Sequence, residues 1–293
     1  MKKLLITFMI LCCYFVSQSQ VSEGTSNKVV IEIGDPTATP AEKREAKITL
    51  EDLGITKLPT YRALIIGVSE YAYAGPGLPN LEKPVQDAEL LASVLMNKYA
   101  FDEKNVTVLK SPTREGIINA FDQMAELSTE KDNLLIFYAG HGVYDKEKDF
   151  GYWLPSDAKK TSRSAWIANS QIKDYVGAIK SKHTLLITDA CFGGSIFKTR
   201  SVELIVKRFY ELYRPNSRKA MTSGNLTEVA DQSVFLKYLI KTLDENEDVF
   251  LSSSSLFTRI YDPILNNASS TTQFGIIQGA GDEGGDFIFI KRD

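Results

Sequence analysis

From residue 61 onward the chain alternates short apolar runs with longer amphipathic stretches. Each apolar run has the length of a strand buried on both faces of a sheet and is bounded by turn or polar residues. The runs that we interpret as strands lie at residues 62–69, 105–110, 132–139, 183–189, 218–224 and 286–290.

The stretches between these runs show the periodicity of helices. In the first, Pro84 stands in the first turn, and Ala88, Leu91, Val94 and Leu95 fall on one face. Further helices are expected at residues 111–127, where a Ser-Pro-Thr sequence can form the cap, and at 169–180, 233–243 and 255–265.

The region between residues 143 and 168 is less regular, and the chain has neither an internal repeat nor a glycine-rich phosphate-binding motif. Strands that alternate with helices at this spacing predict an α/β fold. We expect a three-layer sandwich, in which helices cover both faces of a mainly parallel six-stranded sheet.

Residues 1–19 predict a secretory signal peptide. Two lysines precede an apolar run at 4–16, and Ser17 and Ser19 have the −3 and −1 spacing of a cleavage site. The run is too short to span a bilayer comfortably. A lipoprotein signal at Cys12 or Cys13 and an uncleaved anchor are the alternatives. We therefore expect a secreted or periplasmic protein without stable membrane association after the signal is removed.

Composition limits the partners of the mature chain. The formal net charge of −3 becomes −5 once Lys2 and Lys3 leave with the signal. A mildly acidic chain without a basic tract is not expected to bind nucleic acid. Residues 20–60 form a linker, a pro-segment or an added edge strand, and a single domain is expected at 61–293.

Cys191 is the one cysteine left after the signal peptide, so it cannot form an internal disulfide. It stands just past the carboxyl end of the run 183–189, where open α/β sheets bind their ligands. We interpret it as a nucleophile rather than a packed apolar residue. His141, in the sequence Y-A-G-H-G, stands just past the preceding strand, whereas His183 begins a strand and is interpreted as structural.

If these two strands are adjacent and parallel, His141 and Cys191 emerge side by side. The imidazole can then take the thiol proton and return it to a leaving amine. The backbone N–H groups of Gly142 and Cys191 would form the oxyanion hole. The pattern predicts a Cys–His dyad whose chemistry requires no cofactor.

Y-A-G-H-G and D-A-C-F-G-G resemble the catalytic motifs of caspase-like cysteine peptidases, whose histidine lies about 50 residues before the cysteine. The resemblance runs from Arg62 to the C-terminus and includes the D-A-E-L-L helix. Asp189 stands where caspases proper have Gln, as in metacaspases and paracaspases, but Phe192 replaces the usual metacaspase His. The resemblance implies a caspase-like sandwich with large-subunit-like, linker and small-subunit-like parts at 61–197, 198–217 and 218–293.

The resemblance also implies a substrate preference. In metacaspases and paracaspases two carboxylates line the S1 pocket, which holds P1, the residue before the scissile bond. The matching positions are Asp87 and Asp189. Two carboxylates favour Arg or Lys, so cleavage after a basic residue is expected. An ordinary solvated helix residue is the alternative for Asp87, and Thr222 and Ser223 are expected in the cleft wall.

Two further segments carry predictions. A peptidase with this preference can cut itself at Lys198 or Arg200, although the pattern of 202–213 is equally that of an amphipathic helix. The acidic segment 282–286 raises calcium as a cofactor, which many metacaspases need. Two glycines in five residues do not form an EF-hand loop, and a plain turn is expected, so no metal ligand is assigned.

The sequence thus predicts an exported cysteine endopeptidase that acts on proteins or peptides through Cys191 and His141. One alternative is a catalytically idle caspase-like interaction module. Another is a legumain- or gingipain-like peptidase of the same clan with a different P1 preference. The intact dyad, the adjacent glycines and the acidic pair favour the first interpretation.

Overall fold

The computed structural model describes residues 57–145, 147–190, 197–198, 209–224, 233–268 and 271–292. The predicted signal peptide, most of the leader, Cys191 and Arg200 lie outside the described residues. In the part of the chain that is described, no helix is long and apolar enough to cross a membrane.

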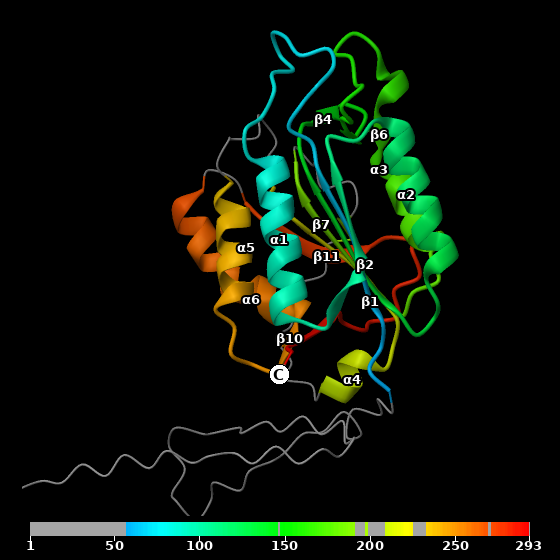
Figure 1. The fold of residues 1–293 in the computed structure, drawn as a ribbon, viewed down its shortest axis with the longest axis vertical. Coiled ribbons are helices and arrows are strands. Elements are labelled where there is room, and N and C mark those ends of the chain that lie inside the picture. Colours follow the sequence, from blue (N-terminus) through cyan, green and yellow to red (C-terminus); the bar gives the residue numbers. More distant parts are fainter. Residues whose placement is uncertain are drawn as a thin grey trace, which may run out of the picture.

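A seven-stranded, mainly parallel sheet forms the centre of the molecule (Figure 1), in the order β2-β1-β3-β7-β9-β11-β8. Its parallel members are β1 (Tyr61–Gly67), β2 (Phe101–Lys110), β3 (Asn133–Ala139), β7 (His183–Asp189) and β9 (Ser217–Thr222). The antiparallel members are β11 (Gln273–Ile277) and the two-residue β8 (Phe197–Lys198). The predicted mainly parallel sheet is confirmed, with β8 as an addition at its edge.

The sixth strand is not the one that we predicted. Residues 286–290 do not close the main sheet, because β12 (Ile288–Ile290) pairs with β10 (Phe250–Ser252) in a separate antiparallel pair. β11 takes the expected place and pairs with β9. Both β12 and the main strands bury apolar side chains in one core, so an apolar run identifies a buried strand without identifying its sheet.

Helices cover both faces of the sheet, as predicted (Figure 1). One face carries α1 (Pro84–Lys98), α5 (Val234–Asp244) and α6 (Ser253–Asn267), and the other carries α2 (Arg114–Leu127) and α3 (Asn169–Ala178). Successive side chains of β1 point to opposite faces of the sheet. Ala63 and Ile65 pack on the face covered by α1, α5 and α6, and Leu64 and Ile66 pack on the face covered by α2 and α3. A short helix, α4 (Phe209–Tyr213), precedes β9.

Helices α1, α2 and α5 begin at a proline or at a side-chain N-cap. Pro84 occupies the first turn of α1, and the predicted inward face of this helix is buried. Thr113 caps α2 by accepting the Gly116 N–H at 3.2 Å. Ser233 caps α5 in the same way, through the Leu236 N–H.

A small antiparallel sheet lies at the carboxyl ends of the main strands (Figure 1). It consists of β4 (Gly142–Asp145), β5 (Phe150–Trp153) and β6 (Ile167–Ala168), in that order. Trp153 stacks on Tyr138 of β3 with ring centroids 4.2 Å apart, which fixes the small sheet to the large one. The sequence pattern did not predict these strands.

Candidate functional site

β3 and β7 are adjacent and parallel, which is the arrangement that the predicted dyad requires. Their register pairs Ala139 with Asp189 at the carboxyl ends, and the Gly140 N–H donates to the Asp189 carbonyl at 3.4 Å. His141 comes two residues after Ala139, and Cys191 comes two residues after Asp189 in the sequence. The chain therefore approaches both positions from neighbouring strands at one edge of the sheet. The cysteine itself lies outside the described residues.

The imidazole of His141 is oriented by a backbone carbonyl. Its Nε2 lies 2.8 Å from the Pro79 carbonyl oxygen, in the loop between β1 and α1. A carbonyl can only accept a hydrogen bond, so Nε2 carries the proton and Nδ1 of the neutral ring keeps its lone pair. The ring also packs against Tyr71, with centroids 5.0 Å apart. Nδ1 is therefore the basic nitrogen of this histidine.

Two tyrosine hydroxyls hold the backbone of His141. The His141 N–H donates to Tyr71 Oη at 2.8 Å, and Tyr138 Oη donates to the His141 carbonyl at 2.8 Å. Burial raises the pKa of Tyr71, so its hydroxyl stays protonated and donates in turn to the Val68 carbonyl at 3.3 Å. Tyr138 stands in the Y-A-G-H-G motif, but neither tyrosine nor Pro79 was predicted as a site residue.

The backbone conformation at position 140 requires a glycine. Its φ of +155° is one that side-chain-bearing residues rarely adopt. A Cβ at this position would also lie 3.0 Å from Tyr138 Oη and 3.1 Å from Tyr71 Oη. The first glycine of G-H-G therefore turns the chain out of β3 within reach of the two hydroxyls that hold His141.

Asp189 is a carboxylate buried at the end of β7. Its exposed fraction is 2 %, and Oδ1 has no hydrogen-bond partner among the described residues. Burial raises its pKa, and the nearby hydroxyls of Ser233 and Ser223 offset this only in part. A buried carboxylate with an unsatisfied oxygen is costly, so the site favours a cationic hydrogen-bond donor.

Asp87 lies in the first turn of α1 and interacts electrostatically with Asp189. Burial, and then the charge of Asp189, raise the pKa of Asp87 to about 6, while Lys83 opposes this shift. The two carboxylates thus share one environment, although they are about 100 residues apart in the sequence.

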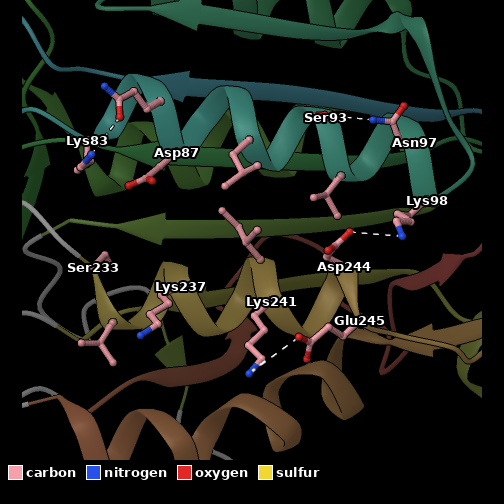
Figure 2. Close-up of a pocket in the computed structure, with 15 residues that line it drawn as sticks. Lys83, Asp87, Ser93, Asn97, Lys98, Ser233, Lys237, Lys241, Asp244 and Glu245 are labelled. Carbon is pink, nitrogen blue, oxygen red and sulfur yellow. Dashed lines mark hydrogen bonds and ion pairs between the residues drawn. The ribbon is translucent and has the colours of Figure 1, made fainter.

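A groove between α1 and α5 leads away from Asp87 (Figure 2). Its volume is about 870 Å³. Asp87 and Ser233 lie at one end, with the Asp87 carboxylate projecting from α1 towards α5, and the Lys98–Asp244 ion pair of 3.5 Å lies at the other. Asp87 therefore lines the groove, whereas the buried Asp189 is not among its lining residues.

A family model described as the caspase domain matches residues 60–273, a span that includes His141, Cys191, Asp87 and Asp189. The chain belongs to the caspase-domain family. Caspase-domain proteins of this family are cysteine peptidases, whose substrates are proteins.

Relatives agree with this membership. Metacaspase-4 from Arabidopsis thaliana is 26% identical over 153 residues, which cover 47% of this chain and 34% of that protein. The chain thus matches about a third of the length of that relative. The crystal structure of protein GSU0716 from Geobacter sulfurreducens aligns with a TM-score of 0.52 at 17% identity, covering 78% of this chain and 100% of the other. This likeness concerns the fold alone.

The other predicted residues of the caspase domain occupy defined places. Gly142 follows His141 directly and begins β4, half-buried. Thr222 and Ser223, at the end of β9, are fully buried, and Ser223 lies close to Asp189. Lys198 is in β8, where it pairs with Ile276 of β11 at the edge of the main sheet. Arg200 lies outside the described residues.

The acidic segment 282–286 takes part in structural hydrogen bonds. Asp282 accepts the Arg218 N–H at 2.8 Å, and Asp286 accepts the Ser254 N–H at 3.2 Å near the start of α6. No three His, Cys, Asp or Glu side chains of the described segments are grouped to hold a metal ion.

Arg218 joins β9 to the neighbouring elements. Its guanidinium is nearly buried and donates to the carbonyls of Ile179, Ser181, Lys182 and Ser217. These hydrogen bonds connect the second half of the caspase domain to the segment between α3 and β7.

His183 is structural, as predicted. It is fully buried at the start of β7, where Nδ1 lies 2.8 Å from Ser217 Oγ and Nε2 lies 3.0 Å from the Tyr213 carbonyl. Burial, with Lys182 nearby, lowers the pKa of His183 to about 3. This histidine is neutral at physiological pH. It lies at the N-terminal end of β7, whereas His141 follows the C-terminal end of β3.

Proposed function

We propose that the protein is a cysteine endopeptidase with a dyad of Cys191 and His141. The observation that supports the proposal is the parallel register of β3 and β7, which pairs Ala139, two residues before His141, with Asp189, two residues before Cys191. The hydrogen bond from His141 Nε2 to the Pro79 carbonyl supports it, because this bond leaves Nδ1 as the base.

The reaction then follows from these groups. His141 Nδ1 takes the proton of the Cys191 thiol, and the thiolate attacks the scissile carbonyl carbon. The N–H groups of Gly142 and Cys191 stabilise the oxyanion. When the C–N bond breaks, the proton on Nδ1 passes to the leaving amine. Water, deprotonated by the same nitrogen, hydrolyses the thioester and regenerates the thiol.

The proposed P1 residue is Arg or Lys. A guanidinium can satisfy Oδ1 of Asp189 and lie near Asp87, whereas an acidic P1 side chain would add a third negative charge. The position of Asp87 at the end of the groove between α1 and α5 supports this preference (Figure 2).

Fluorogenic peptides ending in Arg, Lys or Asp test the function and the preference together, with and without calcium. We expect turnover of the Arg and Lys peptides, and loss of turnover in Cys191→Ala and in His141→Ala. An arginyl chloromethylketone should label the wild-type protein and fail to label His141→Ala. Turnover of the Asp peptide alone would exclude the proposed S1 pocket, and absence of all turnover and labelling would favour an idle interaction module.

Self-processing is proposed at Lys198 or Arg200. The purified wild-type chain should yield two fragments whose new N-terminus is Thr199 or Ser201, and Cys191→Ala should remain intact. Identical processing of the Cys191→Ala chain, purified alone, would assign the cut to another peptidase.

Export is proposed from the sequence of residues 1–19. Protein expressed with its native N-terminus should be recovered outside the cytoplasm and begin at Gln20 by intact mass. A cytoplasmic protein that retains Lys2 and Lys3 would exclude it.

A further inference from the structure

Among the described residues, one edge of the small sheet has no partner strand, and this edge begins next to His141. Its strand order is β4-β5-β6, so β4 is the outer strand, and its first residue, Gly142, directly follows His141. Within the segments that the structure describes, β4 pairs with β5 and with no other strand. A sheet edge of this kind can accept an extended peptide as an additional strand.

The register shows which backbone groups point towards this edge. β4 and β5 are antiparallel, with Gly142 opposite Trp153, and the Leu154 N–H donates to the His141 carbonyl at 3.0 Å. In an antiparallel pair, residues with hydrogen bonds to the partner alternate with residues whose groups point away. Since His141 bonds towards β5, Val143 and Asp145 do so too, and the N–H and C=O groups of Gly142 and Tyr144 point to the outer edge.

We propose that the leaving-group side of the substrate, residues P1′ onward, binds as a strand parallel to β4. The inference rests on the proposed function, in which the Gly142 N–H donates to the P1 carbonyl. Both β4 and the leaving segment run away from the catalytic centre, so the pairing is parallel. A parallel ladder then makes the Gly142 carbonyl accept the P2′ N–H, and makes the Tyr144 N–H donate to the P2′ carbonyl.

This binding mode recognises backbone more than side chains. P1′ lies opposite Gly142, which leaves room for any side chain, and P3′ lies opposite Tyr144. The Tyr144 hydroxyl is already held by Asp149 Oδ1 at 2.6 Å, so its ring has a defined position beside P3′. The substrates are therefore segments that can be extended for several residues after the cut, and proline is excluded at P2′ because it has no N–H.

Internally quenched peptides with Arg at P1 test the proposal through single N-methyl groups. N-methylation at P2′ removes the donor to the Gly142 carbonyl and should lower kcat/KM by about tenfold, as expected for one lost hydrogen bond with a steric clash. N-methylation at P3′, whose N–H points away from β4, should leave kcat/KM within about twofold. The peptide methylated at P3′ is the control for the effect of an N-methyl group on the conformation of the free peptide.

The outcomes separate this inference from the function on which it rests. Equal rates for the P2′ and P3′ peptides, with the unmodified peptide cleaved, would overturn the strand pairing alone. Failure to cleave the unmodified peptide would overturn both. Tyr144→Phe keeps the backbone N–H, so it should preserve the difference between the two peptides. Loss of that difference in Tyr144→Phe would assign recognition to the side chain and contradict the proposal.

Discussion

The Pro79 carbonyl oxygen and His141 Nε2 lie 2.8 Å apart, although the two residues are 62 positions apart in the sequence. This contact joins the loop after β1 to the loop after β3. It fixes both the tautomer and the direction of the imidazole, so the basic nitrogen is set by a backbone group that no side-chain substitution removes. The tyrosines that hold the His141 backbone are open to mutation.

Tyr71→Phe should reduce catalysis without reducing substrate binding. The change removes the hydroxyl that accepts the His141 N–H, so the ring can move away from Pro79. We expect kcat for an Arg peptide to fall about tenfold with KM unchanged. Tyr73→Phe, at an exposed position of the same loop, is the matched control. Equal kcat in the two variants would show that the hydroxyl does not position His141.

Binding of a basic P1 residue should weaken at acid pH. Asp87 has a pKa of about 6, so it is neutral below that pH and attracts a cation less. KM for an Arg peptide should therefore rise as pH falls through 6, by about tenfold at pH 5. Asp87→Asn should show a raised KM with a weaker dependence on pH, because only Asp189 then titrates in the pocket. Asp174→Asn, at an exposed position of α3, should keep the wild-type profile. An unaltered KM profile in Asp87→Asn would place Asp87 outside S1.

The buried carboxylate of Asp189 should lower the stability of the folded protein at neutral and alkaline pH. Its folded-state pKa is raised, so the folded protein holds this proton more tightly than the unfolded chain does. Stability is therefore lost as pH rises above the unfolded value of about 4. Asp189→Asn should raise Tm at pH 8 by about 2–4 °C, and the gain should disappear near pH 4. The same variant should lose turnover of the Arg peptide. A lower Tm at pH 8 would contradict this prediction.

His183 should make the protein sensitive to acid. Its pKa is about 3 in the folded state and about 6.5 when unfolded, so the unfolded chain binds the extra proton. The contribution of neutral His183 is complete above pH 6.5 and is lost progressively as pH falls below that value. His183→Gln should unfold more easily at pH 7, yet its Tm should fall less between pH 7 and pH 5. A parallel fall in both proteins would assign the acid sensitivity to other groups.

Site residues with a distinctive side chain could be predicted from the sequence. His141 and Cys191 each follow an apolar run in the sequence, and β3 and β7 proved to be parallel neighbours, as the predicted dyad requires. Whether the two side chains meet stays a prediction, because Cys191 lies outside the described residues. His183 was recognised as structural because it begins its strand.

The Pro79 contact, the small sheet and β11 could not be predicted, because no distinctive residue or pattern identifies them in the sequence. Pro79 contributes a backbone carbonyl, which every residue type has, so its role depends on the path of the loop. β4 and β5 have four residues each and β6 has two, so these strands are too short for the sequence to show a clear two-residue alternation. The segment of β11 contains Gly275 and begins with Gln273, and it was missed while the more apolar β12 was placed in the main sheet.

The position of β9 has a consequence for a chain that has been cut. β9 belongs to the second half of the domain, yet it lies between β7 and β11, and Arg218 donates to three carbonyls within the α3–β7 connection. At the far end of the chain, Arg292 donates to the carbonyls of Tyr99 and Phe101. Two fragments produced by a break between residues 198 and 209 would therefore share one continuous sheet. They would co-purify as a single noncovalent particle and separate only in denaturant.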